Sequence, residues 1–137
     1  MSARTKARKR ALDLLYSADM RQVPVEQMLV VEAEKAVSEP ERAASWLYAR
    51  EIVDGIVDNR DEIDELIETH SHGWTLERMP AVDRAILRIG VWEIIHNDAV
   101  PDPVAISEAV EAATVLSTDD SAGFVNGLLA AISHSKA

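Results

Sequence analysis

Apolar residues recur at intervals of three and four along almost the whole chain, and regular alternation of apolar with polar residues is found nowhere. The first spacing places apolar side chains on one face of an α-helix, whereas alternation is typical of a half-buried strand. The sequence therefore predicts an all-α protein. In the segment from Pro80 to about Asn97, apolar residues cover well over half of the helix circumference, so we expect it to be the central helix of the core.

Prolines and capping residues divide this pattern into seven expected helices with short connections. Asn59 with Glu62 is typical of a capping box at the start of the fourth helix, and Asp102 before Pro103 is typical of a cap with a first-position proline. A single helical turn is expected at residues 75–78. The seven helices are expected at residues up to about 21, 25–37, 40 to about 58, 60–69, 80–97, 102–116 and 121–133.

Short connections predict that these helices form one domain over residues 1–137. Residues 73–80 could join an N-terminal and a C-terminal half of that domain. In the third helix, Trp46, Leu47 and Val53 fall on the apolar face that we expect to be buried.

The 137 residues include no cysteine, which excludes disulfides, cysteine-based zinc or iron–sulfur sites and a thiol nucleophile. No apolar run approaches the roughly 20 residues that a membrane span needs, and no secretory signal pattern follows the basic N-terminus. We therefore expect a soluble, cytoplasmic protein that does not associate with membranes.

The charges are unevenly distributed along the chain. The net charge of −10 argues against a nucleic-acid ligand if it is treated as a property of the whole chain. However, residues 1–10 have a net charge of +5, and the other 127 residues have a net charge of −15. We call residues 1–10 the basic arm, and its cations are Arg4, Lys6, Arg8, Lys9 and Arg10.

The basic arm indicates a polyanionic ligand, whether or not the arm is ordered. Tyr16 lies seven residues after Lys9 and hence on nearly the same helix face, where its ring could stack on an unpaired RNA base. The alternatives are a disordered tail for the arm and a core-edge position for Tyr16. Residues 51–68 carry eight acids and one cation, which is typical of a solvated helix face or of a surface for a basic protein partner.

No constellation in the sequence indicates catalysis, a metal site or a cofactor. Glu93 and His96 form a Glu-x-x-His pair, but a di-iron site needs a second copy, which is absent from the sequence. His70 and His72 are two residues apart and do not share a helix face. Because the sequence also lacks a Gly-x-Ser-x-Gly elbow and a phosphate-binding glycine loop, we expect a protein that is not an enzyme.

Four segments resemble, in the same order, conserved segments of the NusB family of bacterial transcription antitermination factors. The resemblance extends over essentially the whole chain, and four segments in the right order, at spacings that fit one short domain, make it specific. The segments are ARKRALDLLY at residues 7–16, VDRAILRI at 82–89, VAISEAV at 104–110, and Asp120-Ser121 with FVNG at 124–127.

The resemblance implies a single compact helical domain in two packed halves. It also implies that the protein binds the boxA element of ribosomal RNA leader transcripts as a heterodimer with ribosomal protein NusE. This heterodimer would act in the RNA polymerase antitermination complex and promote processive elongation.

The family's functional residues can be carried over to matching positions of this chain. The resemblance implies RNA contacts for the basic arm, a place for Tyr16 at both the RNA and NusE surfaces, and an RNA-proximal place for Phe124. The acidic residues matched to the NusE interface are Glu77, Asp83 and Asp120.

Two departures from the family pattern affect the expected RNA surface. Thr5 interrupts the arginine run found in some relatives, and Ala122-Gly123 replace larger, often basic residues. We therefore expect a weaker C-terminal half of the RNA footprint.

Two rival functions and one question of assembly stay open at this point. One rival is an all-α protein-binding adaptor without direct RNA contact. The other is a ribosomal RNA cytosine methyltransferase, whose front domain is NusB-like, but that activity needs an α/β cofactor domain that these 137 residues lack. The free protein is expected as a monomer or as a homodimer.

Overall fold

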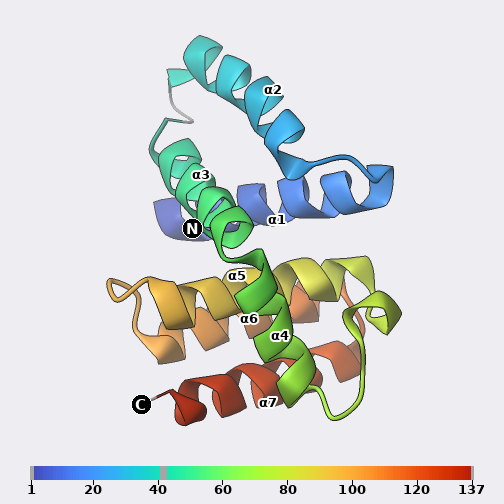
Figure 1. Cartoon of the computed structure of the whole chain (residues 1–137). Coiled ribbons are helices and arrows are strands. Elements are labelled where there is room, and N and C mark those ends of the chain that lie inside the picture. The colour runs from blue at the N-terminus through green and yellow to red at the C-terminus, as the bar shows by residue number, and fades with distance from the viewer. Residues whose placement is uncertain (1, 41–42, 137) are drawn as a thin grey trace. The chain divides into compact units, whose positions relative to one another are not determined.

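The structure is a computed structural model that describes residues 2–40 and 43–136, without the side chain of Ala36. This part of the chain contains seven α-helices and no strand (Figure 1). The predicted all-α fold is therefore confirmed. The elements are α1 (Ala3–Arg21), α2 (Val25–Ser38), α3 (Ala43–Asp58), α4 (Arg60–His70), the 3-10 helix η2 (Leu76–Arg78), α5 (Ala81–His96), α6 (Asp102–Leu116) and α7 (Asp119–Ser135).

The chain forms two compact units, which divide after Asp54 within α3. Our prediction that residues 73–80 join the two halves is therefore wrong, since this segment lies within the second unit. Side-chain hydrogen bonds attach it to α5: Arg84 Nη1 donates to the carbonyl oxygens of Leu76 and Met79 at 3.0 and 2.9 Å. The sequence gives no break at the true division because a continuous helix crosses it.

The first unit is built around the apolar face of α1, which packs against α2. Ser2 begins α1 because its hydroxyl accepts a hydrogen bond from the Thr5 N–H at 3.1 Å, and Gln22, in a left-handed conformation, ends it. Leu47 of α3 is 67% exposed, whereas Trp46 is buried, so our prediction for Leu47 is wrong. One residue turns a helix by about 100°, which moves a side chain from a buried to an exposed face.

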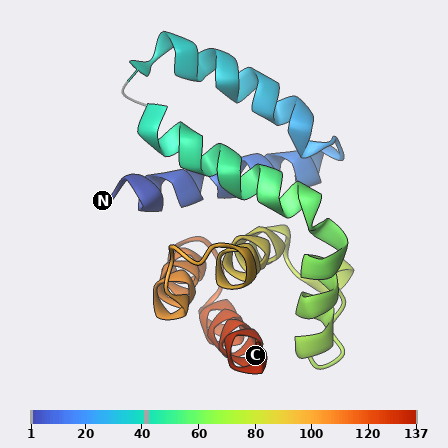
Figure 2. The ribbon, with the colours of Figure 1, turned by 60° about the vertical axis from the view of Figure 1, so that its left-hand side comes forward.

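The second unit has α5 at its centre, as predicted. This helix packs against α4, α6 and α7, and Figure 2 shows α5, α6 and α7 nearly end-on. Burial of apolar side chains along α5 supplies much of the core of this unit. The buried apolar residues of α5 are Ala85, Ile86, Leu87, Ile89, Val91, Trp92 and Ile94.

Two of the predicted caps use their side chains differently. Asn59 precedes α4 but makes no capping hydrogen bond, because its Nδ2 donates to the Gly55 carbonyl at the end of α3, at 2.8 Å. Glu62, the expected partner, instead lies 2.7 Å from His96 Nε2. Asp102 is the first residue of α6 and not its cap, and its carboxylate accepts hydrogen bonds from Ser133 and Lys136.

Asp102 is also the residue at which the end of the chain attaches to the rest of the second unit. Desolvation raises its pKa, but the hydrogen bonds from Lys136 and Ser133 outweigh that effect, so the pKa lies below its usual value. Lys136 also donates to the Ile94 carbonyl at 2.8 Å.

None of the helices described is long and apolar enough to cross a membrane.

Candidate nucleic-acid interface

The basic arm is helical from Ala3 onward, so its cations project from an ordered element. The alternative of a disordered tail is wrong for residues 3–10. Arg4, Lys6 and Lys9 are exposed, whereas Arg8 is only 8% exposed. The arm therefore presents three cations to solvent and holds a fourth against the protein.

The guanidinium groups of Arg4 and Arg8 both lie over the ring of Tyr48, a residue of α3. Their Cζ atoms are 5.2 and 5.9 Å from the ring centroid, within the range of cation–π interactions. No pattern in the sequence singles out Tyr48. Its role depends on α1 and α3 lying together, which no local pattern indicates.

Arg10 makes polar contacts within the first unit. Its Nε donates to Ser45 Oγ at 2.8 Å, and its Nη1 lies 3.6 Å from a Glu32 carboxylate oxygen. Asp13 is part of the same charged group: desolvation raises its pKa, Glu32 adds to that effect, and Lys9 and Arg10 oppose it. Arg10 thus has a structural role, and its contact with RNA stays a prediction.

Two exposed aromatic surfaces lie on the two units. On the first, Tyr16 is 40% exposed, which favours a surface role over a core-edge position. On the second, Phe124 packs against Trp74, with ring centroids 5.3 Å apart and planes inclined at 59°. Trp74 is 47% exposed, so the pair offers an aromatic face to solvent.

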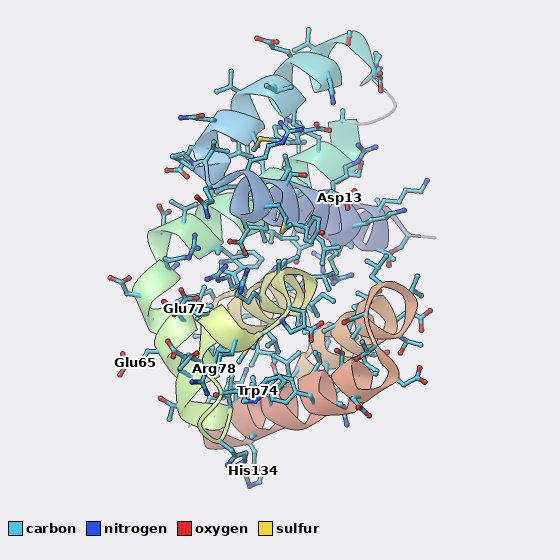
Figure 3. The ribbon with its side chains drawn as sticks, turned by 90° about the vertical axis from the view of Figure 1, so that its right-hand side faces the viewer. Asp13, Glu65, Trp74, Glu77, Arg78 and His134 are labelled. Atoms are coloured by element: carbon cyan, nitrogen blue, oxygen red, sulfur yellow. The ribbon has the colours of Figure 1, made fainter. Side chains whose placement is uncertain are left out.

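A tight turn before η2 presents Trp74. His72 and Gly73 both have positive φ, 55° and 93°, and glycine adopts this conformation without steric cost. The Ser71 hydroxyl donates to the Trp74 carbonyl at 2.5 Å, which fixes the turn. Figure 3 shows that Trp74, Glu77 and Arg78 come from the same stretch of chain before α5. No sequence pattern singles out Trp74, because its pairing with Phe124 is a tertiary contact.

The three acidic residues matched to the NusE interface differ in their exposure. Glu77 and Asp120 are exposed, whereas Asp83 is 2% exposed. Both Asp83 carboxylate oxygens accept hydrogen bonds, from Ser117 Oγ at 2.7 Å and from Ser121 Oγ at 2.8 Å. Asp83 therefore connects the start of α5 to the turn before α7.

The acidic run at residues 51–68 is partly used inside the second unit. Asp64 accepts two hydrogen bonds from Arg88, at 2.9 and 3.2 Å, and Glu62 faces His96. The six remaining acids are all exposed, and Figure 3 shows Glu65 pointing outward from α4. A solvated face accounts for these residues, and docking of a basic partner stays a prediction.

The candidate metal ligands do not gather at one place in the described residues. His96 faces Glu62, while Glu93 is buried, and His70 Nδ1 lies 2.8 Å from the Leu66 carbonyl oxygen. Across residues 2–40 and 43–136, no group of three or more His, Cys, Asp or Glu side chains could hold a metal ion.

Comparison with known proteins decides the family. The NusB family model matches residues 5–134 of the chain. A transcription antitermination protein NusB from Leifsonia xyli subsp. xyli is 76% identical over 136 residues, which cover 99% of this chain and 94% of that protein. The chain belongs to the NusB family. Its resemblance to that family, inferred from four segments, is confirmed.

Solved NusB structures share the fold over nearly the whole chain. NusB from T. maritima is 31% identical, with a TM-score of 0.86, over 98% of this chain and 92% of that one. A chain in the crystal structure of the antitermination factors NusB and NusE in complex with double-stranded RNA is 28% identical, with a TM-score of 0.83, over 99% of both chains. The predicted NusB-type helical fold is therefore confirmed.

Proposed function

We propose that the protein is a transcription antitermination factor that binds boxA RNA of ribosomal RNA leader transcripts as a heterodimer with NusE. It acts in the RNA polymerase antitermination complex in the cytoplasm and promotes processive elongation by binding, not by catalysis. The observation that carries this proposal is the ordered, exposed cationic start of α1 on a chain that is otherwise strongly acidic, in a member of the NusB family.

On the RNA side, the exposed cations and the aromatic rings have different roles. Arg4, Lys6 and Lys9 attract backbone phosphates, and the Tyr16 and Phe124 rings offer surfaces on which unpaired bases stack. Arg8 and Arg10, which are turned toward the protein, support this surface and reach RNA less readily. Arg8 lies over the Tyr48 ring, and Arg10 contacts Ser45 and Glu32.

On the NusE side, exposed acids meet a basic ribosomal protein. Glu77 and Asp120 contact NusE directly, and Tyr16 lies at the border of the NusE and RNA surfaces. Buried Asp83 acts on this interface by fixing Ser117 and Ser121 at the start of α7. The excess of negative charge outside the arm steers NusE toward the protein.

A titration of boxA RNA with and without NusE tests the proposal. The arm offers only about three to five phosphate contacts, so the protein alone should bind weakly and bind much more tightly with NusE. At about −0.7 per contact, log affinity should fall with log salt at a slope of roughly −2 to −3.5. Between 50 and 200 mM salt, this slope is a loss of boxA affinity of about 16- to 130-fold.

A scrambled RNA of equal length is the control for this titration. Equal boxA affinity with and without NusE would refute cooperative binding.

An arm with three of its five cations removed distinguishes the RNA-binding function from that of an adaptor. The variant Arg4→Gln/Lys6→Gln/Lys9→Gln keeps Arg8 and the buried face of α1. Losing three phosphate contacts should make the salt slope shallower by about 2 and weaken boxA binding up to about a hundredfold near 0.1 M salt. NusE binding without RNA and the urea midpoint should stay unchanged.

A matched control removes three exposed cations of the first unit that lie outside the arm. Arg21→Gln/Lys35→Gln/Arg50→Gln changes the net charge by the same amount and should keep the salt slope. If the arm variant bound boxA as tightly as the wild type, the adaptor function would be favoured instead.

A further inference from the structure

We propose that Tyr48 is a positioning residue that, together with the buried Arg8, orients the exposed Arg4 toward the phosphates of bound RNA. This inference rests on the proposed function and deepens it, because neither the sequence motifs nor the family resemblance singles out Tyr48. The deciding observation is that two guanidinium groups share one ring, at 5.2 and 5.9 Å from its centroid.

The spacing of the two arginines explains how one ring reaches both. Residues four apart lie one above the other on a helix face, so Arg4 and Arg8 project from α1 in the same direction. Tyr48 meets them from α3. One turn earlier in α3, Ser45 accepts the hydrogen bond from Arg10, which fixes the register of α3 against α1.

Two like charges at this spacing repel each other, which destabilises the free helix. The negative face of an aromatic ring offsets part of that repulsion. Arg4 carries the exposed guanidinium group of the two, so it is the one that a phosphate of bound RNA can reach.

Stacking on a ring and binding a phosphate use different parts of a guanidinium group. The ring contacts the guanidinium plane, whereas phosphate oxygens accept hydrogen bonds from donors at its edge. The ring therefore restricts the side-chain rotamers before RNA arrives without occupying the edge. Less conformational entropy is then lost on binding.

The burial of the three side chains fits this arrangement. Tyr48 is half-buried and Arg8 is buried, while Arg4 is exposed. Arg8 and the ring thus form a fixed base, and Arg4 extends from it to the surface.

A double-mutant cycle measured with boxA RNA and NusE tests the proposal. Tyr48→Leu should weaken binding about tenfold, the order expected for freeing one long side chain. Tyr48→Phe, which keeps the ring, should stay within about twofold of the wild type. In the Arg4→Gln background, Tyr48→Leu should cause little further loss, because the guanidinium group that it positions is gone.

Three outcomes would overturn the inference. An equal loss from Tyr48→Leu in both backgrounds would mean that the ring contacts RNA or NusE itself. A defect in Tyr48→Phe as large as in Tyr48→Leu would place the role in the hydroxyl group. Wild-type affinity in Tyr48→Leu would remove any role for the ring.

A measurement without RNA separates this inference from the proposed function. The ring current of Tyr48 should shift the side-chain proton resonances of Arg4 and Arg8 upfield in the wild type and in Tyr48→Phe, but not in Tyr48→Leu. Absence of these shifts in the wild type would overturn the inference. If the shifts are present but the wild type with NusE does not bind boxA, the proposed function itself fails. If boxA binds and the cycle is additive, only the role of Tyr48 fails.

Discussion

Replacing Asp83 with alanine should lower the free energy of unfolding by about 3 kcal/mol, because hydrogen bonds to a charged group contribute about 1.5–3 kcal/mol each. The carboxylate accepts hydrogen bonds from both Ser117 and Ser121 in a nearly solvent-free site. Alanine leaves these hydroxyls without their acceptor at the start of α7. A urea titration followed by circular dichroism measures the loss.

The same variant should also weaken NusE binding, because the turn that carries Asp120 loses its attachment to α5. Asp120→Ala is the matched control: Asp120 is exposed in the first turn of α7, so its replacement should change stability by no more than about 0.5 kcal/mol. It should nevertheless weaken NusE binding if that residue contacts the partner. Asp83→Asn, which keeps one acceptor oxygen, should lie between the wild type and Asp83→Ala in stability. Wild-type stability of Asp83→Ala would show that the buried carboxylate is dispensable.

Gly55→Ala is the second substitution from which we expect a large effect. A Cβ atom at Gly55 would lie 2.0 Å from Nε1 of the Trp92 side chain, which is buried in the second unit. A rigid indole ring cannot move aside without disturbing the core around α5. Alanine gains about 1 kcal/mol in helix propensity over glycine, yet we expect a net loss of about 2–3 kcal/mol from the clash.

Two other helical glycines give matched controls for this substitution. At Gly127 a Cβ meets nothing within 4 Å, so Gly127→Ala should be neutral or stabilise the protein by up to about 1 kcal/mol. At Gly90 the nearest atom is Leu129 Cδ1, the flexible end of a side chain, at 2.7 Å, so the effect should lie between the other two. Thermal denaturation of the three variants should give this order. Equal melting temperatures for Gly55→Ala and Gly127→Ala would contradict the clash.

The sequence predicted the elements well because helices depend on local spacing. Pro24 and Pro80 each precede a helix by one residue, and the apolar pattern of α5 corresponds to its position at the centre of the second unit. Capping contacts were less predictable than helix boundaries where a polar side chain had two possible partners. Asn59 could cap α4 or bind the end of α3, and only the folded structure decides between them.

The candidate site was predictable in composition but not in arrangement. Charge distribution alone identified the basic arm, whereas the roles of Tyr48 and Trp74 arise from contacts between distant segments. Burial likewise could not be read from the motif around Asp83, because a carboxylate in a first helical turn is usually exposed. Local sequence contains the helix pattern, and only tertiary packing determines which cations and acids face solvent.

Because the three tryptophans differ in exposure, the intrinsic fluorescence of the protein can report both ligand binding and unfolding. Trp46 and Trp92 are buried, one in each unit, whereas Trp74 stands at the surface beside Phe124. Acrylamide in the folded protein should therefore quench mainly the red-shifted emission of Trp74. A ligand that covers this surface would shield that emission, and the two buried indoles would report unfolding of their own units without any attached dye.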